Sequence, residues 1–161
     1  MSCPLATLFT ITTYGSWLRG DARGWVDDGR VFPPDPQMES EDRRRMKYAA
    51  FGFEKDRFTD IGQMMGDALR SRLDAHIFAM TVQTWHVHVL AIAPHTPSTM
   101  VKCAKDAVRW GLRPGRPIWS RGYDKRYCFD EQAVRARTRY VERHNTDAGL
   151  PARPWTFIER I

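Results

Sequence analysis

The sequence contains no long apolar run, which argues against a helical membrane protein. No stretch of about 18 consecutive apolar residues, the length needed to cross a bilayer, occurs in the 161 residues. The start, Met1-Ser2-Cys3-Pro4, also lacks the basic residues and the apolar core of a signal peptide. We therefore expect a soluble, cytoplasmic protein with no membrane contact.

Cysteine is also scarce, and the sequence contains neither a repeat nor a low-complexity tract. The three cysteines are odd in number and far apart, and no two of them form a CxxC pair. This pattern excludes a disulfide framework, a zinc knuckle built on cysteines and a dithiol redox motif, so we expect reduced thiols. The length suits one domain spanning 1–161, long enough to bury a hydrophobic core.

The positive charge is concentrated in the C-terminal part of the chain. The formal net charge is +6, but residues 1–101 hold 11 basic and 12 acidic residues (−1), whereas residues 102–161 hold 14 and 7 (+7). Aromatic residues, including Trp110, Trp119 and Tyr123, are interleaved with these basic residues. Such a region suits a polyanion with flat rings to stack, such as single-stranded nucleic acid. Composition alone leaves a solvated basic surface equally open.

Four segments have the composition of β-strands. Each is rich in β-branched, aromatic or other apolar residues and is bounded by turn residues or proline. The last has an irregular start, because it follows a basic segment with glycine and proline. The predicted strands are 5–13, 76–83, 86–93 and 118–129, and the second and third form an antiparallel hairpin.

Apolar residues at helical spacing predict three helices. Each has a residue that can accept hydrogen bonds from the first turn, and the second also has a proline at its first helical position. The predicted helices run from Thr59 or Asp60, as N-cap, to about Leu73; from Thr96-Pro97 to Gly111; and from 131, capped by Asp130, to about 145.

The segment at about 15–58 interrupts this pattern. It carries glycines, tryptophans, charges and the run Pro33-Pro34-Asp35-Pro36, which predicts a long loop with a short charged helix over 39–47. The order of the other elements predicts an α+β fold: a split βαβ, ferredoxin- or RRM-like antiparallel sheet with helices on one face. The last helix is additional to that core and is free to cross the other face.

Two histidines stand one residue apart in the run Trp85-His86-Val87-His88-Val89-Leu90. Since side chains alternate along a strand, His86 and His88 share one face. Two adjacent imidazoles can hold a divalent cation if a third ligand comes from elsewhere and coordination positions stay open for a substrate. The same pattern also occurs when two histidines are merely hydrogen-bonded.

The last predicted helix carries a second group of polar residues. Tyr140 and His144 lie four residues apart on one face, with Arg137 three residues before the tyrosine. If this face covers the histidine pair, three nitrogen ligands and a phenol come together. A tyrosine is only about 0.1% ionised at neutral pH, so it needs help as a nucleophile. A divalent ion gives that help by polarising a phosphodiester oxygen, and the products are a 5′-phosphotyrosine and a free 3′-OH.

These residues resemble the single-tyrosine transposases of the HUH endonuclease superfamily, in particular the REP-associated tyrosine transposases. The resemblance covers nearly the whole chain, and it depends on the motifs together and in this order. The matching stretches are Phe9-Thr10 to Gly15-Ser16-Trp17-Leu18 with Gly20-Asp21, then His86-Val87-His88, then Pro117-Ile118-Trp119 with Arg121-Gly122-Tyr123, and Tyr140-Val141-x-x-His144-Asn145.

The resemblance implies that His86 and His88 are metal ligands, that Tyr140 is the nucleophile and that Mg²⁺ or Mn²⁺ is the cofactor. The third ligand, four residues after the tyrosine and commonly Asn or Gln in the family, is His144 here. Asn145 is the alternative, although it lies about 140° round the helix from the Tyr140 face. Three histidines also favour Mn²⁺ or another transition ion over Mg²⁺. The sequence departs from the family pattern by having Trp85 before the first histidine and no Asn-Pro after the tyrosine.

The partner that the resemblance implies is single-stranded DNA beside short hairpins, bound by a nucleoid-associated enzyme. Arg121, Lys125, Arg126 and Arg137 are candidate phosphate contacts. Two other functions stay open: a non-catalytic nucleic-acid-binding module, and a metal-dependent nuclease in which the tyrosine only positions water. A homodimer that shares its active sites also stays open. Tyr123 and Tyr127 are rival nucleophiles that lack a ligand one helical turn away.

Overall fold

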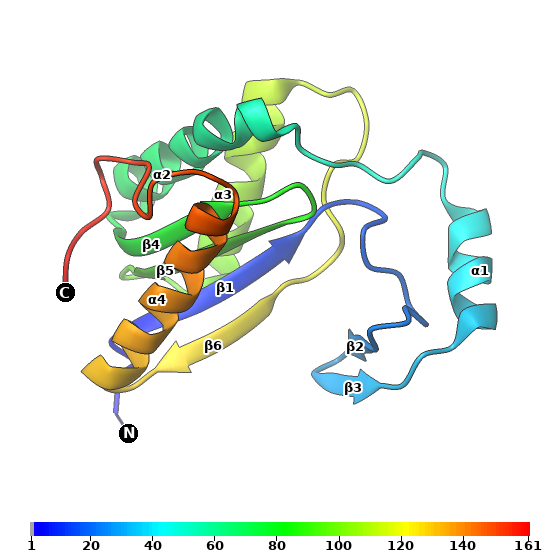
Figure 1. Cartoon of the computed structure of the whole chain (residues 1–161), viewed down its shortest axis with the longest axis horizontal. Coiled ribbons are helices and arrows are strands. Elements are labelled where there is room, and N and C mark those ends of the chain that lie inside the picture. Colours follow the sequence, from blue (N-terminus) through cyan, green and yellow to red (C-terminus); the bar gives the residue numbers. More distant parts are fainter. Residues whose placement is uncertain (1) are drawn as a thin grey trace.

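A four-stranded antiparallel sheet is the centre of the computed structural model, which describes residues 2–161 (Figure 1). The strand order is β4-β5-β1-β6, so that β1 and β5 are the central strands. This arrangement confirms the predicted split βαβ sheet. The strands are β1 (Ala6–Thr12), β4 (His76–Val82), β5 (His86–Ile92) and β6 (Asp124–Cys128).

Helices α2 (Phe58–Leu73) and α3 (Pro97–Leu112) cover one face of the sheet (Figure 1). The main hydrophobic core lies between these helices and the strand residues that point toward them, such as Phe9, Val87 and Val89. In α3, Thr96 caps the first turn by accepting from Thr99 N at 3.2 Å, as the sequence predicted. Alternation along β5 therefore sends its valines into this core and its histidines to the opposite face.

Helix α4 (Glu131–Asp147) crosses the opposite face of the sheet, as predicted (Figure 1). Asp130 begins the helix by accepting a hydrogen bond from Ala133 N at 2.7 Å. Val134 and Val141 pack in a second, smaller core that includes Leu8 and Leu90 of the sheet. This packing fixes the rotation of α4 about its axis and thus the direction of its polar face.

The segment between β1 and α2 is more structured than the predicted loop. It contains a hairpin of β2 (Trp25–Asp27) and β3 (Arg30–Phe32), followed by α1 (Pro36–Arg45) and the short 3-10 helix η1 (Lys55–Arg57). The hairpin turns at Asp28 and Gly29, both of which have positive φ, 46° and 73°, as tight hairpin turns require. Strands of three residues leave too little alternation for the sequence to reveal them.

Two helices begin at residues other than those predicted. α1 begins at Pro36 rather than at residue 39, because Asp35 caps it by accepting from Met38 N at 3.1 Å and proline suits the first turn. α2 begins at Phe58, and neither Thr59 nor Asp60 is its N-cap. Helix η1 leads directly into α2, so no side chain caps its first turn.

The C-terminal tail packs on the body of the protein and forms no strand. Trp155 and Phe157 lie against α2 at Gly62 and Gly66, where a Cβ would come within 2.0 Å and 2.1 Å of the two rings. The two glycines therefore make room for the aromatic side chains. None of the helices among residues 2–161 is long and apolar enough to cross a membrane.

Candidate active site

The two histidines of β5 lie side by side on the face of the sheet that α4 crosses. His88 is opposite Thr10 of β1 and Thr81 of β4, whereas His86 is opposite Thr12 near the end of β1. The ring centroids of His86 and His88 are 4.7 Å apart. The strand therefore presents the imidazole pair that its alternation predicts.

Helix α4 brings Tyr140 and His144 over this pair. The His144 ring centroid lies 5.6 Å from that of His86 and 5.0 Å from that of His88. The Tyr140 ring lies 5.4 Å from His88 and 4.8 Å from His144. Tyr140 keeps 46% of its surface exposed, so the residue is open to solvent at the cluster. Three imidazoles and one phenol from two distant parts of the chain thus form one cluster.

The three histidines could hold a metal ion. One nitrogen of each lies within 4.8 Å of the others. Nδ1 of His88 is 2.7 Å from Thr10 Oγ1, and Nδ1 of His144 is 2.9 Å from the carbonyl oxygen of Tyr140. When these Nδ1 atoms donate, each Nε2 carries a lone pair for an ion. Nε2 of His86 is buried and has no hydrogen-bond partner among the described residues.

Burial keeps two of these imidazoles uncharged. It lowers the pKa of His86 to about 4, with smaller effects from the nearby charges of His144 and Arg23. It lowers the pKa of His88 to about 3, with smaller effects from His86 and His144. Both rings are therefore neutral at neutral pH, which is the state that binds a cation.

Asn145 is fully buried and points away from the cluster. Its Nδ2 donates to the carbonyl oxygens of Met80, at 2.9 Å, and Ala152, at 3.0 Å. The residue therefore ties α4 to β4 and to the C-terminal tail. Of the two alternatives for the third ligand, only His144 faces the histidine pair.

The candidate phosphate contacts fall into two groups. Arg126 and Arg137 lie on the α4 side of the sheet, where Arg137 approaches Cys128 of β6. Lys125 alternates to the other face, and Arg121 lies in the exposed segment before β6. The structure thus does not bring all four basic residues into one patch around the histidines.

Neither of the other candidate tyrosines lies at the cluster. Tyr127 shares the far face of β6 with Lys125, whose Nζ is 5.5 Å from the tyrosine ring. Tyr123 lines an open groove of about 410 Å³ beside α3, together with Lys105 and Trp119. Tyr140 is therefore the tyrosine that accompanies the three histidines.

The sequence pattern did not single out two residues at the site. Thr10 orients His88 and is 78 positions away in the chain, so only the pairing of β1 with β5 reveals it. Arg23 lies near enough to lower the pKa of His86, although it belongs to the segment expected to be a loop. No local spacing signals either role.

Neither protein-family models nor curated proteins match this sequence. Among solved structures, one described as a REP-associated tyrosine transposase bound to a REP hairpin matches 98% of this chain and 76% of its own, with a TM-score of 0.54 and 12% identity. A protein of Deinococcus radiodurans R1, provisionally assigned as a transposase, matches 89% of this chain and 92% of its own, with a TM-score of 0.45 and 14% identity. The first match shows that this chain has the fold of a REP-associated tyrosine transposase, as the sequence motifs implied.

Proposed function

We propose that the protein is a metal-dependent, single-stranded DNA endonuclease and strand transferase whose nucleophile is Tyr140. The observation that carries this proposal is the cluster itself. The half-exposed ring of Tyr140 lies 5.4 Å from the ring of His88, which burial keeps neutral, and 4.8 Å from the ring of His144. A structural role alone does not require three imidazoles and a phenol to converge.

His86, His88 and His144 fit a divalent ion. Their nitrogens lie within 4.8 Å of one another, close enough for all three to bind one ion at metal–nitrogen distances of about 2.0–2.1 Å after side-chain adjustment. Imidazole ligands favour Mn²⁺ and later transition ions over Mg²⁺. The bound ion would polarise a phosphodiester oxygen and leave coordination positions open for the DNA.

The residues of this chain then carry out an exchange of phosphoester bonds. Oη of Tyr140 forms a bond to phosphorus as the bond from phosphorus to the 3′-oxygen breaks, and the phenolic proton leaves to solvent. The 3′-oxygen takes up a proton and becomes a free hydroxyl. Because the phosphoester is kept as 5′-phosphotyrosine, a 3′-OH can attack it in reverse and rejoin strands without another energy source.

Single-stranded DNA beside a hairpin is the proposed substrate. The neighbour described as a REP-associated tyrosine transposase was solved with a REP hairpin, and this chain shares its fold. Arg126 and Arg137 lie on the face that carries the cluster, where they can contact phosphates without reading bases. We place the enzyme in the cytoplasm, associated with the nucleoid.

A denaturing gel with labelled hairpin DNA and Mn²⁺ tests the proposal. Wild type should give a covalent protein–DNA band, and both Tyr140→Phe and His86→Ala should lose it. Tyr127→Phe is the matched control, because this tyrosine lies on the far face of β6, and it should keep the band. Mg²⁺ should support a weaker reaction than Mn²⁺.

Other outcomes of that gel would reject the proposal. Cleavage without a covalent band would indicate a nuclease in which Tyr140 positions water. Binding without cleavage, across a set of hairpins, would indicate a DNA-binding module. A band that survives in Tyr140→Phe would place the nucleophile elsewhere.

A further inference from the structure

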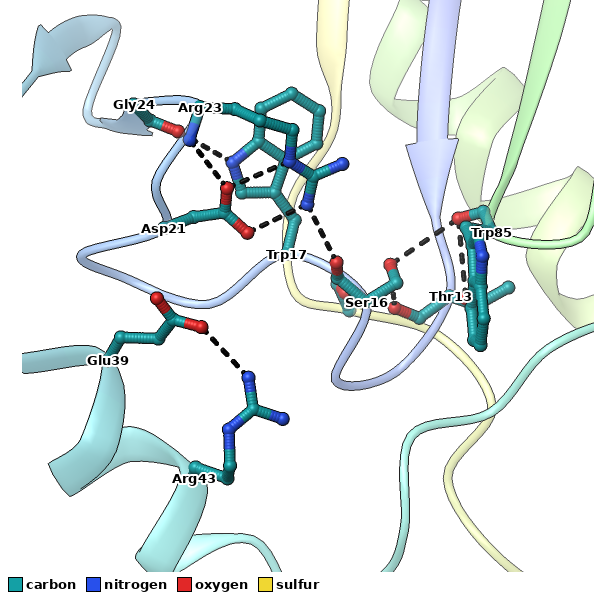
Figure 2. Close-up of polar contacts among 10 residues, drawn as sticks. Thr13, Ser16, Trp17, Asp21, Arg23, Gly24, Glu39, Arg43 and Trp85 are labelled. Carbon is teal, nitrogen blue, oxygen red and sulfur yellow. Dashed lines mark hydrogen bonds and ion pairs between the residues drawn. The ribbon is translucent and has the colours of Figure 1, made fainter. Parts of the chain in front are cut away.

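A rigid unit of Trp17, Asp21 and Arg23 follows β1 (Figure 2). The Arg23 guanidinium lies over the Trp17 ring, with Cζ 4.0 Å from the centroid. Asp21 accepts from Arg23 Nε at 2.8 Å and from Nη2 at 2.7 Å. The indole nitrogen of Trp17 donates to Gly24 O at 2.8 Å. These bonds hold one tryptophan and one arginine in a fixed relation.

The unit also rests on α1. Gly20 has φ +85°, and a Cβ there would come within 2.1 Å of Asp35 O at the start of the helix. Arg19 forms a two-bond ion pair with Asp42, at 2.9 Å and 2.6 Å. Contacts at Arg19 and Gly20, between Trp17 and Asp21, therefore hold this segment against α1.

Arg23 keeps hydrogen-bonding capacity for a ligand. Nη2 donates to both Asp21 and Ser16 O, the latter at 3.0 Å, and Nε donates to Asp21. Nη1 makes no hydrogen bond to the described residues, so two of the five donors of the guanidinium are available. The side chain is 55% exposed. An anchored guanidinium with one open amino group is suited to a phosphate oxygen.

The unit is linked to the histidine site through Ser16 (Figure 2). Oγ of Ser16 donates to Thr13 O at 2.7 Å and to Trp85 O at 3.4 Å, and Thr13 N donates to Trp85 O at 2.9 Å. Trp85 directly precedes the ligand candidate His86. The Arg23 unit and Trp85 thus border the same end of the site.

Two large aromatic side chains are exposed at this end. Trp17 is 44% exposed and Trp85 is 49% exposed. Part of the Trp85 ring packs against Gly52, where a Cβ would be 2.9 Å from Cζ3, so the ring is supported from below. Supported, half-exposed indoles next to an arginine are the combination that binds bases and phosphates of single-stranded nucleic acid.

We infer that Trp17, Arg23 and Trp85 form a platform for the single-stranded nucleotides next to the cleaved phosphate. The two indoles stack on bases, and Nη1 of Arg23 contacts a backbone phosphate. This inference depends on the proposed function for its substrate class, but it assigns strand binding to the near-neutral N-terminal part of the chain. The basic C-terminal region is then not the sole DNA contact.

Binding without chemistry tests the platform. The parent is the Tyr140→Phe protein in EDTA, titrated against a fluorescent single-stranded oligothymidylate that has no hairpin. Trp85→Ala and Trp17→Ala should each weaken binding by about tenfold, the usual cost of losing one stacked base. Arg23→Gln should also reduce the slope of log affinity against log salt by about 0.7, the value for one lost phosphate contact on a single strand.

The control is a similar arginine–tryptophan pair formed by α2 and α3. Arg72 lies over Trp110, with Cζ 4.9 Å from the ring, and Trp110 is also exposed. Trp110→Ala and Arg72→Gln should change affinity and salt slope much less than the platform variants do. Thermal melts followed by circular dichroism identify any variant that has lost its fold. If Trp17→Ala is unfolded, the binding of Trp85→Ala and Arg23→Gln tests the platform.

The results separate this inference from the proposed function. If the platform variants bind like their parent, or if the control variants weaken binding as much, the platform is wrong. If the platform variants weaken binding and the control variants do not, while wild type forms no covalent adduct, the platform is supported and the proposed chemistry is wrong. If wild type forms the adduct and the platform variants bind and react normally, the proposed chemistry is supported and the platform is wrong.

Discussion

His88 makes the free energy of unfolding depend on pH. Its pKa is about 3 in the folded protein, against 6.5 for an ordinary histidine, because burial disfavours the charged ring. Below pH 6.5 the unfolded chain takes up a proton that the folded chain does not. The contribution is therefore fully present above pH 6.5 and is lost as the pH falls toward 3, at up to about 1.4 kcal/mol per pH unit. His86 acts in the same direction down to about pH 4.

Urea unfolding in EDTA checks this linkage. Between pH 6.5 and pH 5, His88 should account for a loss of about 2 kcal/mol in the free energy of unfolding. His88→Gln should flatten the pH dependence, whereas His95→Gln, at an exposed loop histidine, should leave it unchanged. Equal slopes for wild type and His88→Gln would show that His88 is not held neutral by the fold.

At the residue scale, local spacing predicted which side chains share a face, but not which side chains meet across strands. Alternation in β5 and the four-residue spacing in α4 correctly grouped His86 with His88 and Tyr140 with His144. The contact between Thr10 and His88 depends on strand register, and the place of Arg23 depends on a loop held by ion pairs. Neither leaves a local pattern.

Among the elements, α4 contributes Tyr140 and His144 to the site, and Asn145 anchors this helix. Replacing Asn145 by Ala leaves the buried carbonyl oxygens of Met80 and Ala152 without their donor. We expect a loss of about 2–3 kcal/mol in the free energy of unfolding, measured by urea denaturation. Thr146→Ala, at the exposed neighbouring residue, is the control and should change stability little.

The same variant separates the two alternatives for the third ligand. If His144 is the ligand, folded Asn145→Ala protein should still bind Mn²⁺, and His144→Ala should not. Loss of Mn²⁺ binding with unchanged stability in Asn145→Ala would instead make Asn145 the ligand. Isothermal titration of both variants with Mn²⁺ gives the answer.

Elements with a buried face were predictable, and those without one were not. The strands β1, β4 and β5 and the helices α2, α3 and α4 follow from apolar periodicity, and α3 and α4 also from their capping residues. The predicted strand 118–129 was too long, because β6 covers only Asp124–Cys128 and exposes every residue but Cys128. The hairpin of β2 and β3 was missed because its strands are short and mostly exposed. The start of α1 differs from the predicted residue 39 because proline excludes a helix interior but is accepted in the first turn, where Pro36 lies.

At the scale of the whole molecule, the three histidines and the tyrosine of the proposed site lie together within one chain. Tyr140 and His144 cross the sheet of their own chain, over its own His86 and His88. A mixture of Tyr140→Phe protein with His86→Ala protein should therefore form no covalent adduct, because neither chain holds a complete site. Restored adduct in the mixture would show that two chains exchange α4 or share their sites.

The most direct test of the account is the mass of the peptide that carries the nucleophile. After reaction with hairpin DNA and Mn²⁺, nuclease and trypsin digestion would release Tyr140 in the peptide 140–143, Tyr123 in 122–125 and Tyr127 in 127–135, because each is bounded by basic residues. The account predicts that peptide 140–143 alone gains a nucleotide 5′-phosphate. An unmodified 140–143 peptide alongside cleaved DNA, or the added mass on either of the other two peptides, would contradict it.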